Sequence, residues 1–168
     1  MKKSSIGILI IGAGLSGLTI GYYLSKQNIP FKIIEARGRM GGRVQTTSNN
    51  NSAPIELGAT WVAKEHLKLK KILSDLNLDL FEQALGKFAI YEPNSTSQHQ
   101  VVKLPPNNSP SYRISDGTTM LIKALSSYIN DEYIQLNQPV TSIEDHQDSL
   151  LVSTNSEIFY CKQLITTI

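Results

Sequence analysis

The sequence predicts an α/β fold with a central parallel sheet and an additional small antiparallel β-meander. An apolar strand at residues 6–11 leads through a glycine-rich turn into a helical pattern, and a second apolar strand follows at 31–34. Strand, helix and strand within about thirty residues form a βαβ unit, whose crossover is right-handed. Short apolar runs separated by turn signals after residue 134 predict the meander.

Composition places the chain among globular proteins. Its 168 residues suit one domain, with 40% hydrophobic and 18% charged residues. A net charge of +2 gives no reason to expect nucleic acid or an anionic membrane as a partner. The single Cys161 excludes an internal disulfide and favours a reducing, cytoplasmic location. The apolar run at 6–11 is too short for a membrane span, and the turn after it favours a buried strand over a signal peptide.

The first elements follow from apolar periodicity. Residues 6–11 are apolar on both faces, as in a central strand covered by helices on both sides. A helix is expected at 15–27, and Asn28 to Pro30 end it before the strand at 31–34.

The remaining elements are predicted in the same way. We expect a surface loop at 46–54, a short strand and turn at 55–62, and strands with loops at 81–110. Helices are expected at 64–76, where Leu67 is one of five periodic apolar residues, and at 119–129. Short strands are expected at 134–136, 140–143, 150–152, 157–159 and 164–165.

The turn after the first strand has the pattern G-x-G-x-x-G. Gly12 permits the tight turn, Gly14 lets the backbone approach a pyrophosphate, and Gly17 allows close packing of helix on strand. Free backbone N–H groups at the helix start would bind the phosphates, and the Ser16 hydroxyl could add a donor.

An acidic residue completes this Rossmann-like pattern. Glu35 lies at the end of the second strand, where a carboxylate accepts hydrogen bonds from both hydroxyls of an adenosine ribose. It would repel a 2′-phosphate, which disfavours NADP. The structural alternative is a glycine turn beside a surface glutamate.

A glycine- and arginine-rich loop follows at once. The run Glu35-Ala36-Arg37-Gly38-Arg39-Met40-Gly41-Gly42-Arg43 resembles the E-A-R-x-R-x-G-G-R signature of the flavin-containing amine oxidase superfamily. Glu56 to Trp61 resembles the segment that those enzymes run beneath the flavin, and Tyr112 to Thr118 resembles their G-G-T turn. Taken by itself, the arginine-rich run at 37–43 would be interpreted as a solvated basic loop.

The resemblance implies an FAD-binding domain over residues 1–168, with 64–112 a short excursion towards a substrate domain. It assigns no catalytic residue to this chain, and the spacing of the histidines suggests no metal site. The implied FAD contacts are Gly12, Gly14, Ser16, Gly17, Glu35, Ala36, Arg37, Gly42, Arg43, Gly58, Ala59, Thr60, Trp61 and Val140. Trp61 could equally be an ordinary core residue. Val140 is also plausible as a residue of the strand core alone.

One residue departs from the family pattern. Asp116 stands where the family has the first glycine of its turn. If that position needs a positive φ, aspartate can adopt it at modest cost.

Three functional readings remain open. The first is an FAD-dependent amine oxidase, converting amine to imine and O₂ to H₂O₂, of which this chain is the N-terminal part. The family's C-terminal segments have no counterpart in 1–168, so the second is an incomplete or split module that needs a second chain. The third, an NAD-dependent dehydrogenase, is disfavoured by the 37–43 and 56–61 segments.

The remaining reactive side chains have ordinary interpretations. His66, His99 and His146 lack metal-ligand spacing and are expected at the surface. Cys161 is expected in the core.

Overall fold

The computed structural model describes residues 2–48 and 53–168 and divides into two compact units. The first unit consists of residues 1–60 and 116–168, and the second of residues 61–115.

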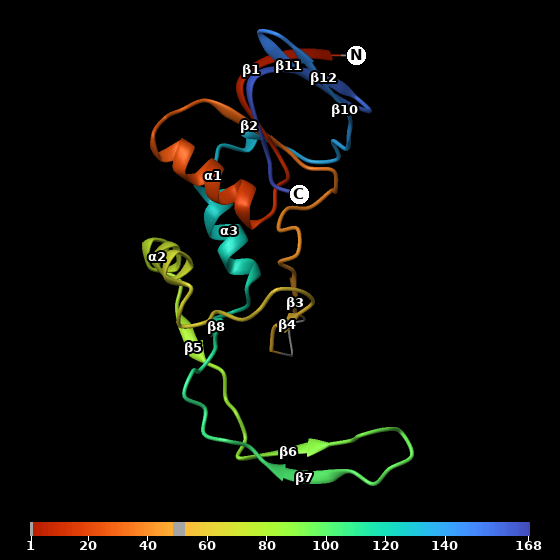
Figure 1. The fold of residues 1–168 in the computed structure, drawn as a ribbon. Coiled ribbons are helices and arrows are strands. Elements are labelled where there is room, and N and C mark those ends of the chain that lie inside the picture. Colours follow the sequence, from red (N-terminus) through yellow and green to blue (C-terminus); the bar gives the residue numbers. More distant parts are fainter. Residues whose placement is uncertain (1, 49–52) are drawn as a thin grey trace. The chain divides into compact units, whose positions relative to one another are not determined.

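A six-stranded mixed sheet forms the frame of the first unit (Figure 1). Its strand order is β10-β11-β12-β1-β2-β9. The four strands from β12 to β9 run parallel, whereas β10, β11 and β12 pair antiparallel as a meander. The bounds are β1 (Lys2–Ile11), β2 (Phe31–Ile34), β9 (Ile134–Gln135), β10 (Val140–His146), β11 (Ser149–Thr154) and β12 (Glu157–Thr166). The predicted fold class is thereby confirmed, and the runs at 157–159 and 164–165 belong to one strand.

Two helices pack together in this unit. The helix α1 (Leu15–Lys26) lies against β2 and against α3 (Thr119–Ser127). Gly21 makes this contact possible, since an added Cβ would lie 2.9 Å from the Ile33 side chain. The short 3-10 helix η1 (Asp131–Tyr133) then leads into β9.

The other face of β1 is covered by the meander rather than by helices. Because side chains alternate along a strand, Leu9 and Ile11 share the face opposite to Ile10. They form one buried cluster with Val152, Phe159 and Cys161 of β11 and β12. The prediction of helices on both sides was therefore wrong for this face, and Cys161 is a core residue as expected.

The predicted loop at 46–54 is partly a strand. β3 (Thr46–Thr47) pairs antiparallel with β4 (Ile55–Glu56). The Ser/Asn run of that loop falls at 49–52, outside the described residues.

The second unit contains one helix and two small antiparallel sheets. The helix α2 (Leu67–Asp75) starts later than predicted, and Leu67 is 73% exposed rather than part of the apolar face. One sheet pairs β5 (Leu80–Glu82) with β8 (Tyr112–Ile114), and the other pairs β6 (Phe88–Tyr91) with β7 (Gln100–Lys103). The assignment of residues 64–112 as a short excursion towards a substrate domain remains a prediction.

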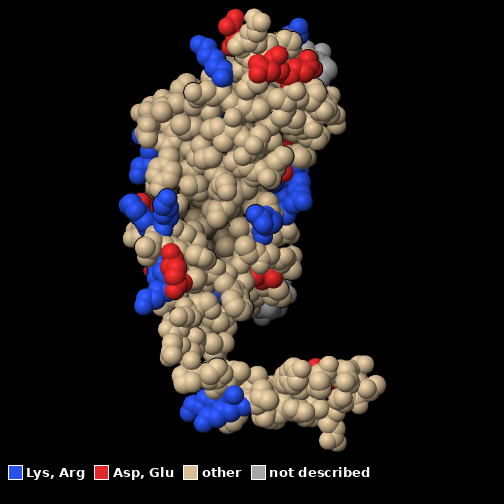
Figure 2. All heavy atoms as spheres, in the orientation of Figure 1, with Lys and Arg blue, Asp and Glu red and all other residues tan. Residues whose placement is uncertain are grey.

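The hairpin of β6 and β7 exposes apolar side chains. Phe88, Ile90, Tyr91 and Val101 are all more than half exposed. In Figure 2 the hairpin lies at the bottom of the view, and most of its surface belongs to residues other than Lys, Arg, Asp and Glu. More than half of each of these side chains is therefore not covered by other described residues, and a two-stranded hairpin without such packing is only marginally stable in water.

No helix within the described ranges is long and apolar enough to cross a membrane.

Candidate dinucleotide-binding site

The glycine loop joins the end of β1 to the start of α1. Gly12 has φ +104°, a conformation that favours glycine, and its N–H donates to the Ile34 carbonyl at 2.8 Å. Gly14 is the N-cap of α1 and carries no side-chain cap. In the described chain, the N–H groups of Gly14, Ser16 and Gly17 have no acceptor, which leaves a row of donors at the positive helix end.

Gly14 and Gly17 are glycines for different reasons. A Cβ on Gly17 would lie 1.9 Å from the Gly12 carbonyl oxygen, so the packing of helix on loop excludes any side chain. A Cβ on Gly14 would meet nothing within 4 Å. The protein itself does not require glycine at 14, and the space there is free for a ligand.

Glu35 connects the glycine loop with the arginine loop. One carboxylate oxygen accepts from the Ala13 N–H at 2.9 Å, and the other accepts from the Arg37 N–H at 2.9 Å. Each oxygen retains a lone pair for a further hydrogen bond. The side chain is half-buried at the end of β2, beside the glycine turn.

Backbone contacts hold the arginine loop against the glycine loop. The Gly41 N–H donates to the Ala13 carbonyl at 2.8 Å, and a Cβ on Gly42 would lie 3.3 Å from the Gly14 Cα. The Arg39 guanidinium donates to the carbonyls of Met40 at 3.1 Å and Gly42 at 3.0 Å. Arg39 therefore braces the turn, a role that its place in the signature could have suggested and that the predicted site omitted.

The guanidinium groups of Arg37 and Arg43 remain exposed. Neither makes a hydrogen bond or ion pair with another described residue. Both arginines lie in the loop that adjoins the glycine turn, so they are free to bind an anionic group.

A third segment lies along the arginine loop. The N–H of Leu57 donates to Gln45 and that of Ala59 to Arg43, at 2.8 and 3.0 Å between donor and carbonyl oxygen. A Cβ on Gly58 would lie 1.9 Å from the Arg43 carbonyl, which explains this glycine by backbone packing. The Thr60 hydroxyl oxygen is buried and has no partner in the described chain. An unpaired buried hydroxyl of this kind is a candidate ligand contact.

The remaining predicted residues have simpler surroundings. Ala36 and Ser16 are exposed, and Val140 packs at the edge of the buried cluster beneath β1. Trp61 is 63% exposed, so the alternative that it is ordinary core is wrong. It lies in the second unit, whereas the other predicted site residues lie in the first.

Hydrogen bonds among Thr46, Glu56, Thr118 and Thr119, here called the polar clasp, satisfy backbone donors at the start of α3. This cluster was not predicted from the sequence. Glu56 accepts from the Thr118 N–H at 2.7 Å and from the Thr46 hydroxyl at 2.8 Å. Thr46 and Thr119 exchange two further hydrogen bonds, at 2.7 and 2.9 Å. In the adjoining turn Asp116 has φ +61°, so the position takes the positive φ that we had considered only as a possibility.

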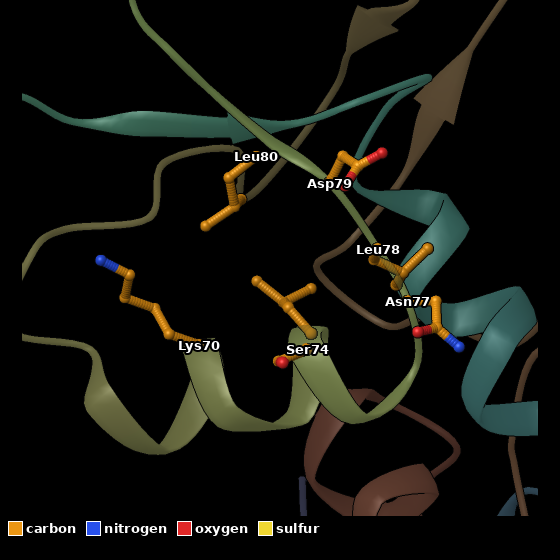
Figure 3. A pocket seen from close by; sticks show the side chains of 7 residues that line it. Lys70, Ser74, Asn77, Leu78, Asp79 and Leu80 are labelled. Carbon is orange, nitrogen blue, oxygen red and sulfur yellow. The ribbon is translucent and has the colours of Figure 1, made fainter.

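The other candidate features lie away from these loops. The second unit has a hollow of about 480 Å³ between α2 and residues 77–80, with Lys70 and Asp79 in its lining (Figure 3). None of the predicted site residues lines it. The three histidines are exposed, and no group of possible metal ligands occurs among the described residues. Burial raises the pKa of the Cys161 thiol.

The strand, glycine turn and helix, with a carboxylate at the end of the next parallel strand, define a dinucleotide-binding domain of the Rossmann-like class. The profile of NAD(P)-binding Rossmann-like domains matches residues 10–76.

Comparison with known proteins shows which dinucleotide-binding proteins the chain is similar to. Polyamine oxidase 2 of Arabidopsis thaliana is 24% identical over 152 residues, covering 89% of this chain and 28% of its own length. Amine oxidase [flavin-containing] A of Sus scrofa is 29% identical over 77 residues, covering 46% of this chain and 15% of its own. The solved cyclohexylamine oxidase from Brevibacterium oxydans IH-35A superposes with a TM-score of 0.83 at 13% identity, covering 97% of this chain and 58% of that one.

In sequence the chain is similar to flavin-containing amine oxidase A and polyamine oxidase 2, and it shares the fold of the solved cyclohexylamine oxidase. It spans less than two thirds of the length of each of these relatives.

Proposed function

We propose that this chain binds FAD through its glycine and arginine loops. The observation that carries the proposal is the Glu35 carboxylate, which accepts from Ala13 in one loop and from Arg37 in the other. An adenosine ribose bound to Glu35 would therefore lie beside both loops, with its pyrophosphate at the start of α1.

Three features of the chain fit this ligand. The space at Gly14 is open, the donors of Gly14, Ser16 and Gly17 are unpaired, and the Thr60 hydroxyl is buried without a partner in the described part of the chain. Arg37 and Arg43 are free to bind phosphate oxygens, while Gly58, Ala59 and Thr60, in the segment that lies along the arginine loop, are proposed contacts with the flavin. Trp61 and Val140 are proposed contacts with the flavin and with the adenine.

The direct test is uptake of flavin by the purified protein. We expect the visible absorption bands of FAD to survive desalting for the wild type. Glu35→Gln should weaken binding by about tenfold or more, because a hydrogen bond to a charged group contributes about 1.5–3 kcal/mol. The exposed Glu65→Gln is the matched control and should bind as the wild type does. A wild type that binds NADH tightly and ignores FAD would favour the dehydrogenase alternative instead.

We propose amine oxidation as the activity of the enzyme to which this part belongs. Bound FAD would supply the electron acceptor, and the residues of this chain bind and orient it. The relatives carry the names of amine, polyamine and cyclohexylamine oxidases, which supports an amine substrate.

A second polypeptide is a further proposed partner. The exposed apolar side chains of the β6–β7 hairpin support it, because such side chains are usually covered by a packing partner. Amine-dependent H₂O₂ release can be measured for the chain alone and after co-expression with a candidate C-terminal half. Release only from the pair would support a split enzyme, whereas release from the chain alone would contradict the need for a partner.

The buried free thiol of Cys161 also suits the proposed cytoplasmic location.

A further inference from the structure

The hydroxyl of Thr167 lies directly behind the glycine loop. Its oxygen is 3.0 Å from the Ile11 carbonyl oxygen and 3.2 Å from that of Gly12. The Ile11 carbonyl already accepts from the Thr167 N–H at 2.9 Å. Within the described residues, the Gly12 carbonyl has no other hydrogen-bond donor than this hydroxyl.

The hydroxyl fills the space that the missing side chains of two glycines leave. An added Cβ would lie 2.8 Å from the Thr167 Oγ1 at Gly12 and 3.0 Å from it at Gly17. Glycines at 12 and 17 and threonine at 167 therefore form one packed unit.

The peptide group between Gly12 and Ala13 is thus held at both ends. Its carbonyl accepts from the Thr167 hydroxyl, which shares its one proton between the carbonyls of Gly12 and Ile11, and its N–H donates to Glu35 at 2.9 Å. With this peptide plane fixed, the next N–H groups, which have no acceptor within the described chain, keep their orientation, and the space beside Gly14 is open.

We propose that Thr167 is a positioning residue that orients the glycine loop for the pyrophosphate of the dinucleotide. It acts through the Gly12 carbonyl and does not touch the ligand. The inference rests on the proposed FAD binding and extends it to a residue far away in the sequence.

The test compares three variants of the full chain. Thr167→Val keeps the shape and removes the hydroxyl, Thr167→Ser keeps the hydroxyl, and Thr166→Val changes the exposed neighbouring threonine as a control. Thr167→Val should weaken binding of both FAD and ADP by about tenfold, the loss expected for one hydrogen bond. Thr167→Ser and Thr166→Val should stay within about twofold of the wild type, on the same scale of binding energies.

A second readout needs no dinucleotide. In the ligand-free protein, amide exchange at Ala13, whose N–H donates to Glu35, should be faster in Thr167→Val than in the wild type and normal again in Thr167→Ser. Unchanged exchange and unchanged FAD affinity in Thr167→Val would overturn the proposal, and so would a serine variant that behaves like the valine one. If the wild type had no affinity for FAD, the proposed function would be contradicted. The exchange rates would still decide whether Thr167 orients the glycine loop.

Discussion

At the scale of single residues, two positions of the glycine loop are glycine for different reasons, one connected with folding and the other with the proposed binding. Gly17 packs its Cα against the Gly12 carbonyl, where a side chain has no room. Gly14 has open space around it and φ −78°, a backbone conformation that any residue adopts. Packing within the fold explains Gly17, and the proposed dinucleotide would explain Gly14.

Alanine substitutions distinguish these two glycines. Gly14→Ala should keep the thermal midpoint of the wild type and yet lose FAD affinity, because its methyl group would occupy the place of the pyrophosphate. Gly17→Ala should lower stability by about 1–3 kcal/mol, the usual cost of overpacking. Thermal unfolding and FAD titration measure the two effects. Equal destabilisation by both variants would contradict the distinction.

Cys161 permits a second residue-scale prediction. The thiol is 1% exposed, and its burial raises its pKa, so less thiolate is present at any given pH than in the unfolded chain. Alkylation by iodoacetamide at pH 8 should therefore be slow in the native protein and fast in denaturant. Mass spectrometry follows the modification, and rapid labelling of the native protein would show that this part of the core is open.

At the scale of elements, the start of α3 is closed by protein groups. The Glu56 carboxylate accepts from the N–H and the hydroxyl of Thr118, at 2.7 and 3.0 Å, and from the Thr46 hydroxyl. The start of α1 has no such cap. The two helix starts therefore differ in the backbone N–H groups that they leave unpaired. Of the two, α1 is the one that offers such donors to a ligand, at the positive end of its dipole.

Removal of the clasp should destabilise the first unit. Glu56→Ala leaves the Thr118 N–H without its acceptor and should cost about 2 kcal/mol. Glu56→Gln keeps one carbonyl oxygen for Thr118 and should cost less. Urea unfolding measures both, with the exposed Glu65→Ala as the control. A cost for Glu56→Ala no larger than that of the control would mean that the clasp contributes little.

At the scale of the whole molecule, the predicted ligand contacts fall almost entirely in the first unit. That unit contains the glycine loop, the arginine loop and residues 57–60, while the second contains Trp61 and the hollow beside α2. Binding should therefore stabilise mainly the first unit.

FAD should raise the thermal midpoint of the first unit. A ligand at one hundred times its Kd adds about 2.7 kcal/mol, which corresponds to roughly 5–10 °C for a chain of this size. Riboflavin lacks the adenosine and the pyrophosphate and should produce no shift at the same concentration. A shift of equal size with riboflavin would place the binding energy in the flavin rather than in the loops described above.

The sequence predicted the parts of the site that are contiguous in the chain. Glycine spacing predicted the turn at 12–17, and the acidic residue after the second strand predicted Glu35. It did not predict contacts between residues far apart, because no local pattern encodes them. Thr167 and Gly12 are separated by 155 positions, and Thr118 and Glu56 by 62. Likewise, the apolar run of β1 indicated two covered faces without showing that the meander covers one of them.

The most direct test of FAD binding at the two loops is a two-dimensional ¹⁵N–¹H NMR titration of the labelled chain with FAD. The proposal predicts that the largest shifts fall on the amides of Gly12 to Gly17, Glu35 to Arg37 and Gly41 to Arg43. The β6–β7 hairpin should be unaffected. Shifts confined to the hollow beside α2, or no shifts at all with millimolar FAD, would contradict it.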